Sequence, residues 1–224
     1  MSSCLAIPRT TDRPQPRLRA ARTRIPRGVH IVEASGGARR RALEAFIAAR
    51  GRMAYGARIR SFLPRLYALV DSDGERLAAF GLRDAAAGRL FLENYLDQPI
   101  EQVVGARDAG PVARQEIVEI GNLAGCHPGA LRLLSPLLGD RLLGMGYRWL
   151  VFTGSAQLIN GFARLGIDLD VLAPAAIERL PEHSRADWGS YYDHAPLVVC
   201  ADIAAGRARL RPSRPADDVA GPTE

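Results

Sequence analysis

The segment QEIVEIGNLAGCHPGA, residues 115–130, decides the fold of this 224-residue chain. It opens with closely spaced β-forming residues, which predict a strand ending near Ala124. A glycine-containing loop over 125–129 follows, and leucines then recur at helical spacing over 131–145. A strand, a loop and a helix in this order bring a helix N-terminus to a strand end, where backbone N–H groups attract anions.

Outside this segment the sequence predicts further helices and strands, with no internal repeat. Helices are expected over 38–53, 99–104, 131–145 and 155–165, and strands over 66–70, 76–82, 90–92, 115–124, 148–153 and 196–203. Asp71-Ser72-Asp73-Gly74 suits a tight hairpin turn. Pro136 is expected either to kink its helix or to begin a shorter one capped by Ser135. The pattern predicts one α/β domain with a mixed sheet.

The two ends of the chain differ from its middle. Residues 1–28 are rich in Pro and Arg and are expected to form a flexible basic arm, 29–206 a single domain, and 207–224 a disordered tail. All 30 basic residues are Arg, and fifteen of them lie no later than Arg65 beside three acids, a balance of +12 against +6 for the whole chain. We expect a solvated arm and no nucleic-acid partner, although such an arm can bind polyanions or an acidic protein.

The three cysteines, Cys4, Cys126 and Cys200, are far apart and lack metal-ligand spacing. The sequence therefore predicts neither a disulfide framework nor a metal site. It also lacks the apolar run of about 7–15 residues of a signal peptide and the roughly 20 apolar residues of a membrane span. We expect a cytoplasmic protein without stable membrane insertion.

Residues 115–167 resemble the core of the GNAT superfamily of acyltransferases, down to the closing element Phe162-Ala163-Arg164-Leu165-Gly166-Ile167. The resemblance implies a mixed, mostly antiparallel central sheet flanked by helices, with an acyl-thioester donor along the central strand. The implied donor-binding residues are Leu123, Ala124, Gly125, Cys126, Gly129, Ala130 and Asn160. The superfamily's usual Gln/Arg-x-x-Gly-x-Gly/Ala loop is not intact here. Acyl carrier protein is therefore expected as a donor and partner on equal terms with coenzyme A, without a tightly bound cofactor.

A further resemblance, to the thermostable hemolysin family, extends from Phe62 to Ile203. Its carriers are residues 62–64, 79–83, 90–101, 117–124, 149–153 and 188–193. The family name denotes a lytic phenotype, but its fold is similar to that of acyl-homoserine-lactone autoinducer synthases. By that similarity Arg83 matches a strand Arg and is implied to bind substrate, and Glu119 matches a Glu of the central strand. Asn122 stands where those synthases carry an Arg, which argues against a homoserine-lactone product.

Five residues complete the predicted site. Glu119 sits among apolar residues on the predicted central strand, where a carboxylate is costly unless it is paired or poised for chemistry. Burial raises the pKa of such a group toward the working range of a general base, so we expect Glu119 to be the base, with Glu93 second. Asn122 is expected to contact substrate or to end a strand. Trp188 and Tyr191 are expected to wall an acyl pocket or to belong to the core.

The sequence thus predicts an N-acyltransferase that moves an acyl group from a carrier thioester to an amine on a small molecule. Backbone N–H groups of the central strand are expected to stabilise the oxyanion of the tetrahedral intermediate. One alternative is a lytic, membrane-active protein, as the family name implies. Another is a binding module armed by the arginines of residues 9–65.

Overall fold

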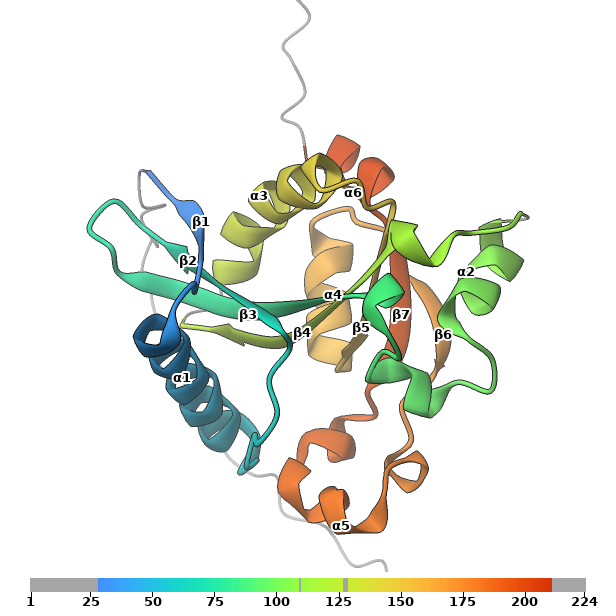
Figure 1. Cartoon of the computed structure of the whole chain (residues 1–224), viewed down its shortest axis with the longest axis horizontal. Helices are drawn as coiled ribbons and strands as arrows, with labels where there is room; N and C mark the ends of the chain where they lie inside the picture. The colour runs from blue at the N-terminus through green and yellow to red at the C-terminus, as the bar shows by residue number, and fades with distance from the viewer. Residues whose placement is uncertain (1–27, 109, 127–128, 211–224) are drawn as a thin grey trace, which may run out of the picture.

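The computed structural model describes residues 28–108, 110–126 and 129–210 (Figure 1). Its strands are β1 His30–Glu33, β2 Arg65–Val70, β3 Arg76–Asp84, β4 Ile117–Gly125, β5 Trp149–Gly154, β6 Asp170–Pro174 and β7 Leu197–Asp202. Its α-helices are α1 Gly37–Tyr55, α2 Ile100–Asp108, α3 Ala130–Gly144, α4 Ala156–Arg164, α5 Glu182–Arg185 and α6 Ile203–Arg209. None of these helices combines the length and the apolar character needed to cross a membrane.

In this part of the chain the strands form one sheet in the order β1-β2-β3-β4-β5-β7-β6. Only the β4–β5 pair is parallel, and every other neighbouring pair is antiparallel. The predicted α/β fold with a mixed, mostly antiparallel sheet is confirmed. The hairpin predicted around Asp71–Gly74 joins β2 to β3, and the Asp71 carboxylate accepts the backbone N–H groups of Asp73 and Glu75.

Side chains alternate between the two faces of the sheet, and each face has its own core. On one face Phe80, Leu82, Val118 and Ile120 pack with Leu134, Leu138 and Leu142 of α3, Phe162 of α4 and Ile203 of α6. On the other face Leu43 and Ile47 of α1 pack on Ala79 and Ala124, while Leu90, Leu92, Ile100 and Val104 pack with Ile117 and Val151. The second face therefore has two separate clusters, and the candidate site lies between them.

Three predictions about local structure were wrong. Residues 90–92, predicted as a strand, form a bend that leads into a 3-10 turn, Leu92–Tyr95. The reason is that the N–H groups of this stretch bind the carboxylates of Glu93 and Glu119 instead of a neighbouring strand. The strands β1 and β6, at the two edges of the sheet, were not predicted at all.

Pro136 does not start a second helix, since α3 runs continuously from Ala130 to Gly144 with Pro136 inside it. Ser135 does not cap a helix. Its hydroxyl donates to the carbonyl oxygen of Leu131, one turn earlier, at 2.7 Å.

The domain extends slightly beyond the predicted boundary at residue 206, because α6 continues to Arg209. Arg207, predicted to begin the tail, donates to both carboxylate oxygens of Asp140 on α3, at 2.5 and 2.9 Å. This bidentate ion pair and the packing of α6 on α3 hold the end of the helix in place. The rest of the predicted tail and nearly all of the predicted arm lie outside the described residues.

Candidate active site

A β-bulge interrupts the middle of β4. The register with β3 passes from Ala79↔Ala124 to Gly81↔Gly121, so that two steps along β3 face three steps along β4. Asn122, inside the bulge, has a φ of 51°, in the left-handed region that Asn tolerates better than most residues. Bulges of this kind bend a strand and change the direction of its side chains.

Beyond Glu119, β4 and β5 separate. Their pairing within the described residues ends at Glu119↔Val151, whereas β4 stays beside β3 as far as Gly125 and β5 stays beside β7 as far as Gly154. The second half of β4 therefore has no strand partner on its β5 side among these residues. We call this opening the fork, and Glu119 stands at its vertex.

Asn122 connects the bulge to the segment that precedes β2. Its Oδ1 accepts the backbone N–H of Leu63 at 2.8 Å, and its Nδ2 donates to the carbonyl oxygen of Ser61 at 3.3 Å. Leu63 covers a pair of glycines, because a Cβ on Gly81 would lie 2.7 Å from its Cβ and one on Gly121 would lie 3.0 Å from its Cδ1. Both polar groups of Asn122 thus bind the chain itself, which favours a structural role over the substrate contact, although Asn122 lies inside β4 and does not end it.

We expect Asn122→Ala to lower the free energy of unfolding by about 2–5 kcal/mol. It leaves the buried N–H of Leu63 without an acceptor, which costs about 1–3 kcal/mol, and forces Ala into the left-handed region, which costs about 1–2 kcal/mol. Asn122→Gly loses the same acceptor but tolerates the backbone conformation, so it should be the more stable variant. Chemical denaturation of both, with Asn122→Asp as the acceptor-retaining control, tests this. An Ala variant as stable as the wild type would contradict it.

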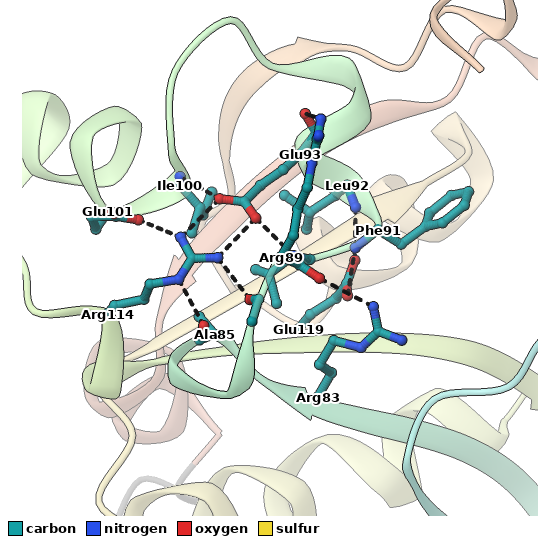
Figure 2. A network of polar contacts seen from close by, with 12 residues as sticks. Arg83, Ala85, Arg89, Phe91, Leu92, Glu93, Ile100, Glu101, Arg114 and Glu119 are labelled. Carbon is teal, nitrogen blue, oxygen red and sulfur yellow. Dashed lines mark hydrogen bonds and ion pairs between the residues drawn. The ribbon is translucent and has the colours of Figure 1, made fainter. Parts of the chain in front are cut away.

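Glu119 is buried at the vertex of the fork, with 4% of its surface exposed. Its Oε2 accepts the N–H of Phe91 at 3.1 Å, and its Oε1 accepts the N–H of Leu92 at 2.9 Å (Figure 2). Burial raises the pKa of Glu119 above the ordinary 4.5, against the opposing effects of these two bonds and of the positive charge of Arg83. A carboxylate with a raised pKa is a better proton acceptor, as a general base requires.

The raised pKa of Glu119 predicts a pH dependence of activity. Only the ionised carboxylate accepts a proton, so kcat/KM should fall in acid with a midpoint above 4.5. Titration of Glu119 does not itself destabilise the fold in acid, because an acid whose pKa is raised by folding favours the folded state at low pH and loses that contribution as pH rises through the folded pKa. The measurement is kcat/KM against pH for wild type and Glu119→Gln. A limb that persists unchanged in the variant would belong to another group.

Glu93, the second predicted base, has a different environment. Its carboxylate accepts the N–H groups of Leu90 at 2.7 Å and Ile100 at 3.0 Å, and Arg114 donates to both of its oxygens at 2.8 Å. Burial alone raises the pKa of Glu93, but the bonds from Arg114 and from the two backbone N–H groups prevail and lower it to about 2. A carboxylate this acidic and this fully bound is a poor base. These contacts favour Glu119 over Glu93 as the base and favour an anchoring role for Glu93.

Arg114, which binds both carboxylate oxygens of Glu93, was not predicted from the sequence. Its guanidinium also donates to Ala85 O at 2.7 Å, Gly88 O at 2.8 Å and the Glu101 carboxylate at 2.5 Å. Figure 2 shows Glu93 turned toward Arg114 and Glu119 turned toward Arg83, with the 89–92 backbone between the two carboxylates. The Arg114–Glu93 contact joins positions 21 residues apart, and no local pattern marks it.

Trp188 and Tyr191 lie beside this centre. The Phe91 ring, whose backbone binds Glu119, lies 5.6 Å from the Trp188 ring, which lies 5.7 Å from that of Tyr191. The Tyr191 hydroxyl donates to the carbonyl oxygen of Thr153 at 3.3 Å, on β5 past the fork. All three rings are half-buried. The structure therefore places both predicted aromatic residues next to the fork.

These aromatic residues are held by the connection between β6 and β7, residues 175–196, which reaches the end of α1 (Figure 1). The Ser190 N–H donates to the carbonyl oxygen of Tyr55 at 2.8 Å. Gly189 has a φ of 52°, and a Cβ there would lie 2.0 Å from the same oxygen. Only glycine fits this contact, so the backbone itself fixes where Trp188 and Tyr191 lie.

The predicted donor-binding residues follow the fork toward α3. Leu123, Ala124 and Gly125 belong to β4 past Glu119, Gly129 is the N-cap of α3, Ala130 is its first residue, and Asn160 is exposed on α4. Cys126 binds the start of β3, since its N–H donates to Leu77 O and its thiol to Arg76 O, each at 2.9 Å. Its polar groups therefore hold the end of β4 against β3. Residues 127 and 128 lie outside the described part.

A hollow of about 540 Å³ lies beside the 88–101 stretch. It is lined by Gly88, Arg89, Glu93, Leu96, Asp97, Gln98, Pro99, Glu101 and Arg114. Most of its charges are already paired, Glu93 and Glu101 with Arg114, and Asp97 with Arg179. We therefore place the candidate active site at Glu119 and the fork.

Comparison with known proteins identifies the fold and the family. TofI, solved in complex with an inhibitor and MTA, is 17% identical, with a TM-score of 0.54 over 82% of this chain and 96% of its own. FeeM, an N-acyl amino acid synthase from uncultured soil microbes, is 16% identical, with a TM-score of 0.54 over 82% and 95%. No curated protein matches the chain by sequence. The likeness to TofI and FeeM confirms the GNAT-like fold.

The sequence model of the family described as thermostable hemolysin matches residues 34–207. This range contains every strand from β2 to β7, the fork, and the carboxylates of Glu93 and Glu119. It covers most of the chain and includes all six sequence blocks on which the resemblance was based. The chain therefore belongs to the thermostable hemolysin family.

Proposed function

We propose that this chain is an N-acyltransferase that moves an acyl group from a carrier thioester to an amine on a small molecule. One observation carries the proposal, namely a buried carboxylate with a raised pKa at the vertex of a fork between two parallel strands. The shared fold of FeeM, an N-acyl amino acid synthase, supports acyl transfer to nitrogen as the reaction class.

In the proposed mechanism the thioester lies along β4 past Glu119, where backbone groups have no strand partner on the β5 side. Glu119 takes a proton from the ammonium form of the amine, directly or through water. The nitrogen lone pair then forms a C–N bond to the carbonyl carbon, and the electrons of the C=O bond move to oxygen. Unpaired N–H groups of β4 stabilise that oxyanion. The nitrogen loses its second proton, collapse of the intermediate breaks the C–S bond, and the thiolate leaves and takes up a proton.

The donor is a substrate, so the proposal needs no tightly bound cofactor. The residues that we propose to contact it are Leu123, Ala124, Gly125, Gly129, Ala130 and Asn160. Trp188 and Tyr191 are proposed to line the pocket for the acyl chain, because half-buried rings offer apolar area beside the fork. Acyl carrier protein and coenzyme A remain two candidate carriers, because the loop at the start of α3 lacks the usual phosphate-binding pattern.

Hydrogen exchange tests the position of the donor. A thioester lying along β4 should slow amide exchange within residues 120–125 and leave the Ile117–Glu119 amides, already in the parallel ladder, nearly unchanged. The probes are a long-chain acyl-coenzyme A and the matching acyl carrier protein, with unacylated forms as controls. Protection elsewhere on the chain, or none with either carrier, would contradict the proposed site.

A further inference from the structure

Two arginines flank the 88–93 stretch, and they differ in how their hydrogen-bond donors are used. All three guanidinium nitrogens of Arg114 are bound to carbonyl or carboxylate oxygens. Arg83 makes a single hydrogen bond within the described residues, from Nη1 to the carbonyl oxygen of Arg89 at 3.3 Å. Arginine has five N–H donors and is always charged. Most of the Arg83 donors therefore have no partner among the described residues.

Arg83 and Glu119 are direct register partners on β3 and β4. Opposite residues of an antiparallel pair place their side chains on the same face, with Cβ atoms about 5 Å apart. Figure 2 shows both side chains on one side of the 89–92 backbone. The two groups make no ion pair with each other in the described structure, although Arg83 is close enough for its charge to act on Glu119. A positive and a negative group thus lie side by side at the vertex of the fork.

Next to Arg83 and Glu119, two glycines leave the surface of β3 and β4 without side chains of their own. Gly81 and Gly121 are register partners. Each lies two residues from Arg83 or Glu119 along its strand, and therefore on the same face of the sheet. They are covered by Leu63, which Asn122 holds in place. Along the strands the charged pair therefore has the Leu63-covered glycines as neighbours, and the backbone N–H of Phe91 binds Glu119.

This arrangement is complementary to a molecule that carries an amine and a carboxylate close together. A guanidinium binds a carboxylate through two parallel hydrogen bonds, and Glu119 accepts a proton from an amine. We infer that the acceptor is an amino acid, with its carboxylate bound by Arg83 and its amine at Glu119. This inference rests on the proposed function and names the substrate class for the same site.

The reaction balances with this acceptor. The amino acid enters as an ammonium carboxylate, and the ammonium gives one proton to Glu119. The free amine attacks, and the nitrogen loses a second proton after the C–N bond has formed, while the leaving thiolate gains one. The products are an N-acyl amino acid, a thiol and one proton released to solvent. The carboxylate of the acceptor stays bound to Arg83 and takes no part in bond making.

Matched acceptors test the inference. Leucine and phenylalanine are compared with isoamylamine and phenethylamine, which lack only the carboxylate. The wild type should prefer the amino acids by about 10²–10³-fold in kcat/KM, because a site built to bind a carboxylate rejects an analogue without one. Arg83→Met should remove most of this preference by raising KM for the amino acids, so that the amino-acid-to-amine ratio of kcat/KM falls toward one. The ratio within each variant cancels any general loss of activity.

Arg83→Lys and Arg89→Met are the companion variants. Lys keeps the charge but not the bidentate geometry and should restore part of the preference, whereas Arg89→Met should keep all of it. If the wild type acylates amines and amino acids equally, or Arg83→Met keeps the preference, the inference is wrong while the proposed function stands. If the wild type acylates neither class with any carrier, the proposed function itself fails. The wild-type comparison needs no variant, so misfolding cannot decide the outcome.

Discussion

Replacing Arg114 by Met is expected to lower the free energy of unfolding by about 3–5 kcal/mol. Met keeps most of the apolar stem but provides no donors, so the buried carboxylate of Glu93 loses the partner that binds both of its oxygens. The carbonyl oxygens of Ala85 and Gly88 lose theirs as well. Urea denaturation measures the effect.

Arg209→Met is the matched control. Its ion pair with Asp168 spans 3.8 Å, with 68% and 94% of the two side chains exposed, and surface pairs of this kind contribute about 0–1 kcal/mol. The loss in Arg114→Met should also depend on pH. The lowered pKa of Glu93 means that its stabilising contribution is present above about 4.5 and disappears as pH falls toward about 2, so the difference from wild type should shrink in that range. A loss no larger than that of Arg209→Met would contradict the anchoring role.

Glu119→Gln is expected to lower the rate of acyl transfer by about 10²–10⁴-fold. Gln keeps the shape and can accept one of the two backbone N–H groups from Phe91 and Leu92, but its amide nitrogen cannot accept the other. We therefore expect a stability loss of about 1–3 kcal/mol and a folded protein. Steady-state acyl transfer and a melting curve are measured on one preparation.

Glu116→Gln is the control for this change. Glu116 lies just before β4, and its carboxylate accepts the N–H of Ala113 at 3.0 Å, so the substitution alters a carboxylate three residues from Glu119 without entering the fork. Its activity should match that of the wild type. Equal losses in the two variants would mean that the effect comes from the start of β4 and not from the chemistry of Glu119.

The central elements of the fold were predictable because their signals are local. The hairpin around Asp71–Gly74 has a turn sequence, and Glu119 is flanked by the apolar β-forming residues Ile117, Val118 and Ile120. The edge strands β1 and β6 were missed because each is short and mostly exposed or half-buried, and β6 ends in Pro174. Neither has the alternating pattern that marks a strand.

The candidate site was predictable only where burial follows from neighbours in sequence. The apolar flanks of Glu119 predicted a buried carboxylate, and the structure has one. Glu93 looked similar in sequence, but its environment depends on Arg114, a contact between segments that only the tertiary fold brings together. The function of Asn122 likewise depends on Leu63, 59 residues away. Long-range polar contacts of this kind leave no periodic signal.

The most direct test of the central claim is amine-dependent release of thiol from an acyl thioester, measured with wild type and Glu119→Gln on preparations whose folding is checked by a melting curve. Both acyl-coenzyme A and acyl carrier protein are offered as donors, and mass spectrometry identifies the amide formed in step with the thiol. The account predicts that the wild type forms equal amounts of thiol and N-acyl product, and that the folded variant is slower by about 10²–10⁴-fold. A folded Glu119→Gln protein that turns over at the wild-type rate would contradict it.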